Sequence, residues 1–229
     1  MTSWFHLSAL GGLSVTGFVA SVTAVWLLAS RRRCLALSWC LLFGAALAVA
    51  AGSQVAFLGW GLGVQSLDFT GFSGHATRAA AVFPVALFLL LEKKGGWIRR
   101  GAVLAGALLG VGVAAARVNV GAHSPSEAVT GCVLGFATAG LFLWHARGRT
   151  GYVYSPYALL PGLLLSSLLL TYVKSVDAHQ ALTAVALKLS GQDRIFQRHG
   201  WRHQSTSYVP PCQAERVRFD YFCARDLAD

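Results

Sequence analysis

The sequence predicts an all-α, polytopic membrane protein with about six transmembrane helices and a C-terminal segment on the outer side. Hydrophobic residues make up 55% of the 229 residues and charged residues only 12%, whereas an average soluble domain carries about 25% charged residues. The mean hydropathy is +0.56, and the apolar residues occur in long uninterrupted runs. These observations exclude a soluble enzyme, a disordered chain and a DNA-binding module.

Six apolar runs approach the roughly 20 residues that a helix needs to cross the hydrocarbon core. Their predicted bounds are Leu7–Ser30, Cys34–Leu58, Ala76–Leu91, Gly101–Arg117, Ala128–His145 and Tyr157–Val173. The fourth run is rich in glycine and alanine, which favours close contact between helices over contact with lipid. We therefore expect one membrane domain over residues 1–173.

Short basic loops predict the orientation of these helices. The net charge is +10, and clusters at 31–33, 93–100 and 147–149 lie between apolar runs. Loops rich in Lys and Arg stay on the cytoplasmic side, so the charge indicates topology and not nucleic-acid binding. We expect a bacterial inner-membrane protein whose two termini face outward, together with the loops after the second and fourth runs.

The composition changes at about Lys174, and residues 174–229 are predicted to lie outside the membrane. An amphipathic helix at the membrane interface is predicted over Asp177–Ser190, from the helical spacing of Leu182, Val185, Ala186 and Leu189. In an oxidising compartment Cys212 and Cys223 are candidates for a disulfide, although spacing alone does not establish the pairing.

A first group of ionisable residues lies at the outer start of the third run, where such residues are functional candidates because their burial is costly. Ser73 suits an N-cap, and Gly74 lets an anion approach the unpaired N–H groups of the helix. His75 and Arg78 are three residues apart and share a helix face. An ordinary helix cap with an interfacial His and Arg gives the same pattern, so this group alone does not establish a site.

A second group joins the fourth and fifth runs and contains Arg117, His123 and Glu127. The last two are four residues apart, close enough for the carboxylate to hold the imidazole N–H and fix its tautomer. Ser124 to Glu127 also fits a capping box with Pro125 at the first helical position. The cap alone would explain Glu127, but the two roles are compatible.

The two groups gain weight together, because two histidines, two arginines and a carboxylate converge on one membrane face that otherwise carries little charge. Such a set can bind a phosphate, attack it and protonate a leaving group. A transporter would instead carry polar groups near the middle of the membrane or a repeated helix pattern.

The order Ser73-Gly74-His75 followed by Arg117-x5-His123-x3-Glu127 resembles the second and third signature motifs of the type 2 phosphatidic acid phosphatase (PAP2) superfamily. The resemblance covers roughly residues 54–145 and implies a PAP2-like helical core. It also implies a phosphatase that needs no metal or other cofactor.

The resemblance implies a role for each residue of the two motifs. His123 would be the nucleophile that forms a phosphohistidine, and Glu127 would orient it. His75 would protonate the leaving group and then activate water. Arg117 and the backbone around Ser73 and Gly74 would hold the phosphoryl oxygens. This division suits phosphoryl transfer because it separates the nucleophile, the proton donor and the cationic donors.

Three positions depart from the family pattern. Phe72 stands where Pro is usual, Ala116 where Ser is usual, and Glu127 where Asp is usual. Glu for Asp keeps the charge but lengthens the side chain by one methylene, so the geometry has to adjust.

The first family motif, Lys-x6-Arg-Pro, is absent, because no Lys or Arg lies between Arg33 and Arg78. Two phosphate-binding cations are therefore missing. We expect Arg78 to supply part of that charge, and a basic residue of the C-terminal segment, such as Lys174 or Arg194, to supply the rest.

The function implied is that of an integral-membrane lipid phosphatase. Its substrate would be an amphiphile with a phosphate at headgroup level: a polyprenyl diphosphate such as undecaprenyl diphosphate, phosphatidic acid, phosphatidylglycerol phosphate or a lipid A phosphate. A lipid phosphotransferase and a non-catalytic protein that binds a lipid phosphate or a partner protein are the alternatives. The oligomeric state is not predicted.

Overall fold

The computed structural model describes residues 2–147 and 178–198. Within these ranges the regular structure is helical, apart from one isolated bridge between Val64 and Phe69. The helices are α1 (Thr2–Leu10), α2 (Leu13–Ala29), α3 (Arg33–Trp60), the 3-10 helix η1 (Gln65–Leu67), α4 (Gly74–Leu90), α5 (Gly96–Asn119), α6 (Pro125–Ala146) and α8 (Ala178–Ser190). The all-α prediction is confirmed for this part of the chain.

Four helical stretches are long and apolar enough to cross a membrane, namely Ser3–Ala29, Arg33–Trp60, Gly96–Asn119 and Pro125–Ala146. The third predicted run forms α4, a shorter apolar helix of 17 residues. The sixth predicted run, Tyr157–Val173, lies outside the described residues, so a count of six spans is not confirmed. Lys174, Cys212 and Cys223 also lie outside them.

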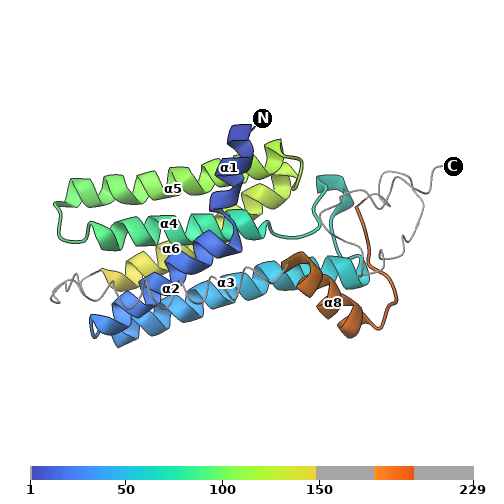
Figure 1. Cartoon of the computed structure of the whole chain (residues 1–229), viewed down its shortest axis with the longest axis horizontal. Coiled ribbons are helices and arrows are strands. Elements are labelled where there is room, and N and C mark those ends of the chain that lie inside the picture. Colours follow the sequence, from blue (N-terminus) through green and yellow to red (C-terminus); the bar gives the residue numbers. More distant parts are fainter. Residues whose placement is uncertain (1, 148–177, 199–229) are drawn as a thin grey trace.

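The first predicted run, Leu7–Ser30, lies within the candidate span Ser3–Ala29, but it is not one continuous helix. It breaks at Gly11 and Gly12 into α1 and α2, and α1 turns to pack against α5 (Figure 1). A Cβ on Gly11 would lie 2.5 Å from Val113 and 3.1 Å from the Cβ of His75. The break therefore lets the chain pass closely over the end of α4.

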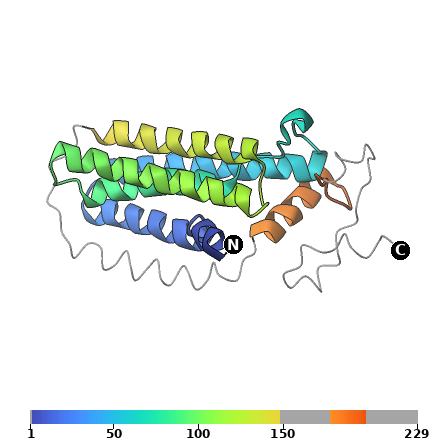
Figure 2. The same cartoon turned by 90° about the horizontal axis from the view of Figure 1, so that it is seen from above.

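Helix α4 is the centre of the bundle and packs against α2, α3, α5 and α6 (Figures 1 and 2). The Gly/Ala-rich α5 packs closely against it. A Cβ on Gly106 would lie 2.6 Å from the backbone of α4 at Phe83, and one on Gly110 would lie 2.8 Å from the Cα of Ala80. The prediction that this segment serves close helix–helix contact is confirmed.

The apolar core fills the half of the bundle toward the basic turns. Trp39 of α3 meets Phe142 of α6 edge-to-face, with ring centroids 5.4 Å apart, and both are buried with Leu27 and Leu89. The indole N–H of Trp39 donates to the carbonyl of Ala20 at 3.0 Å. The large ring therefore ties α3 to both neighbours without leaving its N–H unpaired.

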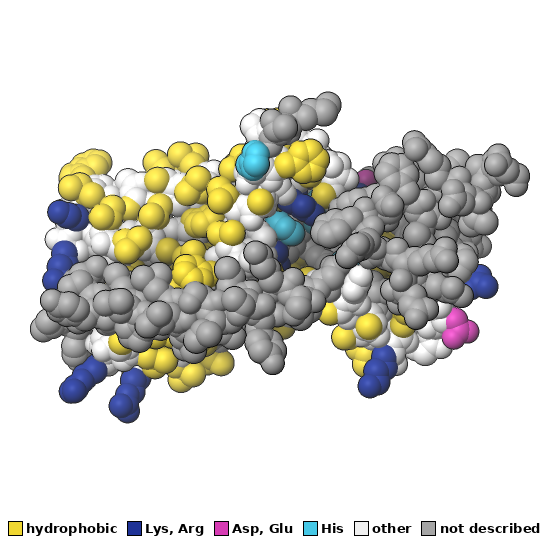
Figure 3. All heavy atoms as spheres, viewed as in Figure 1, with side chains coloured by type: hydrophobic (Ala, Val, Ile, Leu, Met, Phe, Trp, Pro, Cys, Tyr) yellow, Lys and Arg dark blue, Asp and Glu magenta, His cyan; other side chains and the backbone are white. Residues whose placement is uncertain are grey.

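The three basic turns lie at one end of the bundle. Figure 1 places the α2–α3 turn, the α4–α5 turn and the end of α6 together, and Figure 3 shows Lys and Arg side chains gathered there. Arg32 and Glu92 bridge the first two turns at 2.7 Å. This clustering is the arrangement that the basic loops predict, while the side of the membrane that they face stays a prediction.

Helix α8 matches the amphipathic helix expected over Asp177–Ser190 and lies beside the end of α3 (Figures 1 and 2). A Cβ on Gly59 would lie 3.2 Å from the carbonyl oxygen of Ala186, which is fully buried. Val185 and Leu189 remain 46% and 64% exposed. Their position at a membrane interface, and the division of the chain at residue 174, stay predictions.

Candidate active site

His123 and Glu127 form a buried ionisable pair at the end of the bundle opposite the basic turns. Nδ1 of His123 lies 2.8 Å from Oε2 of Glu127. The Glu127 side chain is 1% exposed and that of His123 is 18% exposed. Because Nδ1 contacts the carboxylate, Nε2 is the ring nitrogen that remains for a ligand. The ring is partly exposed, so a ligand can reach it.

The start of α6 explains why these two side chains meet. Ser124 is the N-cap, Pro125 occupies the first turn, and the capping box with Glu127 is complete. The Ser124 hydroxyl accepts from the Glu127 N–H at 3.3 Å, and the Glu127 carboxylate accepts from the Ser124 N–H at 3.2 Å. Glu127 therefore both caps the helix and holds His123, as the sequence allowed.

The turn before α6 sets the spacing between Arg117 and His123. Arg117 lies in the last turn of α5, and its carbonyl accepts from the N–H groups of Ala122 at 3.1 Å and His123 at 3.3 Å. Gly121, with φ +71°, has the left-handed conformation that lets the chain reverse. The five residues between Arg117 and His123 are thus the end of a helix and a tight turn.

The start of α4 lies directly against this turn. The Ser73 N–H donates to the Glu127 carbonyl at 3.1 Å, and Ser73 Oγ accepts from the Ala76 N–H at 3.5 Å. A Cβ on Gly131 would lie 2.8 Å from the Ser73 carbonyl oxygen, so α4 and α6 touch here. Ser73 is a fully buried N-cap, and its N–H is already used in a hydrogen bond. The N–H groups of Gly74 and His75 are therefore better candidates than that of Ser73 to bind an anion.

Helix α1 and the break after it hold the two arginines. Arg78 donates from Nε and Nη2 to the Gly11 carbonyl at 3.3 and 3.1 Å, and Nη2 lies 3.4 Å from Nδ1 of His75. Arg117 Nη1 donates to Ser8 Oγ at 3.2 Å. The His75 ring interacts electrostatically with Arg117, Arg78 and His123. The two sequence motifs therefore meet in space, around a concentration of positive charge suited to an anion.

Glu127 has further partners that the sequence did not reveal. Its Oε1 accepts from the Thr70 N–H at 2.8 Å and also from the Thr70 hydroxyl and from Nη2 of Arg198. Arg198 also pairs through Nε with Asp68 Oδ1 at 3.3 Å. Asp68 was visible as one of few charges on this face, but nothing in its spacing pointed to Arg198.

Among the described residues of the C-terminal segment, Arg198 contacts the candidate site through Glu127, while the expected role of Arg194 in holding phosphate stays a prediction. Arg194 is exposed, and two residues later the Phe196 N–H donates to the Leu58 carbonyl at 2.8 Å. Lys174 is not among the described residues. Arg78 does lie beside His75, although its role in holding phosphate stays a prediction.

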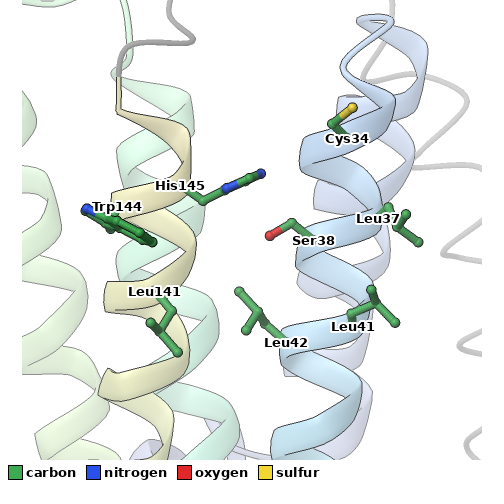
Figure 4. Close-up of a pocket in the computed structure, with 8 residues that line it drawn as sticks. All are labelled: Cys34, Leu37, Ser38, Leu41, Leu42, Leu141, Trp144 and His145. Carbon is green, nitrogen blue, oxygen red and sulfur yellow. The ribbon is translucent and has the colours of Figure 1, made fainter.

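A cavity of about 450 Å³ lies between α3 and α6 (Figure 4). Its lining is apolar apart from two polar side chains, and comprises Cys34, Leu37, Ser38, Leu41, Leu42, Leu141, Trp144 and His145. Along α6, His145 is 18 residues from Glu127, or about 27 Å. The cavity lining contains no Lys or Arg to hold a phosphate, so this cavity is not the candidate active site.

Among the described residues, no group of three or more His, Cys, Asp and Glu side chains could hold a metal ion.

Comparison with known proteins agrees with the motif geometry. The family model of the PAP2 superfamily matches residues 54–150. The chain is also 40% identical over 142 residues to an uncharacterized 22.5 kDa protein in the cps region of Klebsiella pneumoniae, a match that covers 62% of this chain and 68% of that protein. The chain belongs to the PAP2 superfamily. No solved structure matches it significantly.

Membership of the PAP2 superfamily supports a phosphatase-type activity and association with a membrane. The family match spans α4, α5 and α6, so it includes every residue of the two motifs. Helix α1 and the segment that carries Arg198 lie outside the match. In this PAP2 protein, α1 and the segment that carries Arg198 therefore contact the matched region from the two ends of the described chain.

Proposed function

We propose that this protein is an integral-membrane lipid phosphatase that works through a phosphohistidine on His123. The observation that carries the proposal is the 2.8 Å contact between His123 Nδ1 and Glu127 Oε2, beside His75 and Arg117. A carboxylate on Nδ1 keeps the proton there and leaves Nε2 unprotonated, as a nucleophile needs.

In the first step, Nε2 of His123 attacks phosphorus and the bond from phosphorus to the leaving oxygen breaks. His75 gives its proton to that oxygen, while Arg117, Arg78 and the N–H groups at the start of α4 compensate the charge on the phosphoryl oxygens. In the second step, His75 accepts a proton from water as its oxygen attacks phosphorus, and the bond from phosphorus to Nε2 breaks, which releases inorganic phosphate and restores His123. The chain's own residues balance every proton in this cycle.

The proposed substrate is a lipid monophosphate or diphosphate whose headgroup reaches the outer end of the bundle. A polyprenyl diphosphate such as undecaprenyl diphosphate, a phospholipid phosphate and a lipid A phosphate all fit this chemistry. The proposed location is the bacterial inner membrane with the site facing the periplasm. The Klebsiella relative is uncharacterized, so its name favours none of these lipids.

The test is release of inorganic phosphate by the detergent-purified protein, with EDTA present, from a panel of lipid mono- and diphosphates. We expect His123→Ala to lower turnover by a factor on the order of 10⁴ or more. The matched control is His145→Ala, because that histidine lies on α6 and lines the apolar cavity far from Glu127. Vanadate, which mimics pentacoordinate phosphorus, should inhibit the wild type.

Phosphate release that persists in His123→Ala would contradict the assignment of the nucleophile. Folded wild-type protein that releases no phosphate from any lipid in the panel would contradict hydrolysis. Adding an acceptor lipid then distinguishes a phosphotransferase, which labels the acceptor, from a protein that only binds the lipid phosphate.

A further inference from the structure

Arg198 reaches Glu127 from 71 residues further along the chain, and its position is set by specific packing. Helix α8 lies on α3 at Gly59, and the following segment returns across the end of α3. There the Phe196 N–H donates to the Leu58 carbonyl at 2.8 Å. A Cβ on Gly61, which has φ +69°, would lie 2.9 Å from the Phe196 ring. These two contacts fix Phe196, which lies two residues before Arg198 in the sequence.

The Arg198 guanidinium bridges two carboxylates. Nε lies 3.3 Å from Asp68 Oδ1, and Nη2 donates to Glu127 Oε1 and, at 3.3 Å, to Thr70 Oγ1. The Arg198 side chain is 26% exposed and that of Asp68 is 42% exposed. The bridge therefore runs from the protein surface to a side chain that is almost completely buried.

The partners of Glu127 are divided between its two oxygens. Oε1 accepts from Arg198 and from both donors of Thr70. Oε2 accepts from His123 Nδ1 and from the Ser124 N–H. Because a carboxylate is planar, fixing Oε1 in place also fixes the direction in which Oε2 meets the imidazole. The longer arm of Glu, in place of the family's Asp, allows the carboxylate to reach both sets of donors.

The side chains that are linked in this series of contacts have alternating charges. Asp68 is negative, Arg198 is positive and Glu127 is negative. The His123 ring becomes positive when Nδ1 carries a proton and Nε2 carries either a second proton or a phosphoryl group. A buried carboxylate needs a compensating partner, and Arg198 provides one while His123 is neutral. Arg198 thus keeps Glu127 charged and in place in the resting state of the site.

We propose that Arg198 is a positioning residue that holds Glu127 so that its second oxygen orients His123 for attack on phosphorus, with Asp68 as the outer anchor of Arg198. This inference rests on the proposed function only in taking His123 as the residue that attacks phosphorus. The contacts of Arg198 are with carboxylates and a hydroxyl, which distinguishes it from Arg78 and Arg117 as cations for the phosphate itself.

The first test compares wild type, Arg198→Ala, Arg198→Lys and Asp68→Asn, with Lys188→Ala as a matched control because Lys188 is an exposed cation on α8. We expect Arg198→Ala to lower kcat about 10- to 100-fold, as loss of an orienting partner does, with KM and vanadate inhibition unchanged. Arg198→Lys should recover part of kcat, because an ammonium group restores the charge but not the fork. Asp68→Asn should reduce kcat by a smaller factor.

The second test does not depend on turnover. In protein labelled with ¹⁵N-histidine, the Nδ1–H proton of His123, identified by its loss in His123→Ala, should be protected from exchange in wild type and Lys188→Ala. It should exchange faster in Arg198→Ala. If no lipid is hydrolysed, the proposed function fails while this spectrum still tests the role of Arg198. If Arg198→Ala does not fold, Asp68→Asn carries the same test, because Asp68 is half-exposed.

Two results would overturn the proposal. A loss of vanadate inhibition with kcat retained would make Arg198 a phosphate ligand. An unchanged His123 signal and unchanged kcat in folded Arg198→Ala would show that the contact has no part in the site.

Discussion

Glu92 and Glu127 are carboxylates at opposite ends of the same bundle, and each is paired with an arginine. Both oxygens of Glu92 accept from one nitrogen of Arg32, at 2.9 and 2.7 Å. The oxygens of Glu127 are divided, one toward Arg198 and Thr70 and the other toward His123. The Glu92 pair joins two turns, whereas Glu127 joins a cation to a histidine.

This difference shows that a buried ion pair does not by itself identify a functional site. The side chains of Arg32 and Glu92 are 10% and 13% exposed, and their contact links two turns of the bundle. What distinguishes Glu127 is a third partner, the imidazole of His123, whose Nδ1 lies 2.8 Å from Oε2.

The largest expected difference is between Glu127→Gln and Glu92→Gln. An amide cannot compensate the charge that develops on His123, so we expect Glu127→Gln to lower kcat by a factor on the order of 10³ to 10⁴. Glu92→Gln should leave kcat of the folded protein unchanged. Phosphate release from the best lipid substrate measures both, and similar losses in the two variants would contradict a special role for Glu127.

A smaller difference is expected between the arginines. Arg117→Ala removes a cation proposed to hold the phosphoryl oxygens, so kcat should fall about 10²- to 10³-fold, and vanadate should inhibit more weakly. Arg32→Ala should leave vanadate inhibition at the wild-type level. Titration of vanadate against both variants is the measurement, and an unchanged inhibition constant in Arg117→Ala would remove it from the phosphate site.

The smallest effect concerns stability at the basic end. A double-mutant cycle with Arg32→Ala and Glu92→Ala should give a coupling free energy of about 1 to 3 kcal/mol, the range for hydrogen bonds to charged groups. Unfolding in mixed micelles measures it. A coupling below about 0.5 kcal/mol would place the pair with ordinary surface salt bridges.

Much of the candidate site was predictable because its interactions are local. The capping box and the contact between His123 and Glu127 join residues three and four apart, and the helix geometry alone brings such residues together. Ser73 as an N-cap and the side-by-side placement of His75 and Arg78 have the same basis. The family motifs then indicated that the two groups meet, which the contact between Ser73 and Glu127 bears out.

The contacts missed by sequence reasoning are all long-range. Thr70 is 57 residues from Glu127 and Arg198 is 71 residues from it. Arg78 is 67 residues from Gly11, whose carbonyl it holds. Sequence spacing carries no signal for such pairs, so the approach of Arg198 to Glu127 could not be predicted from it.

The sequence by itself determined that the described chain is helical, apolar and basic at its turns, and that its reactive side chains stand at helix ends. These properties follow from composition and from interactions within one or two turns. Only the tertiary structure decided the break at Gly11 and Gly12, the approach of α5 to α4 and the arrival of Arg198 at Glu127. Each of these depends on which backbone surfaces can come within contact distance, and that is a property of the packed bundle.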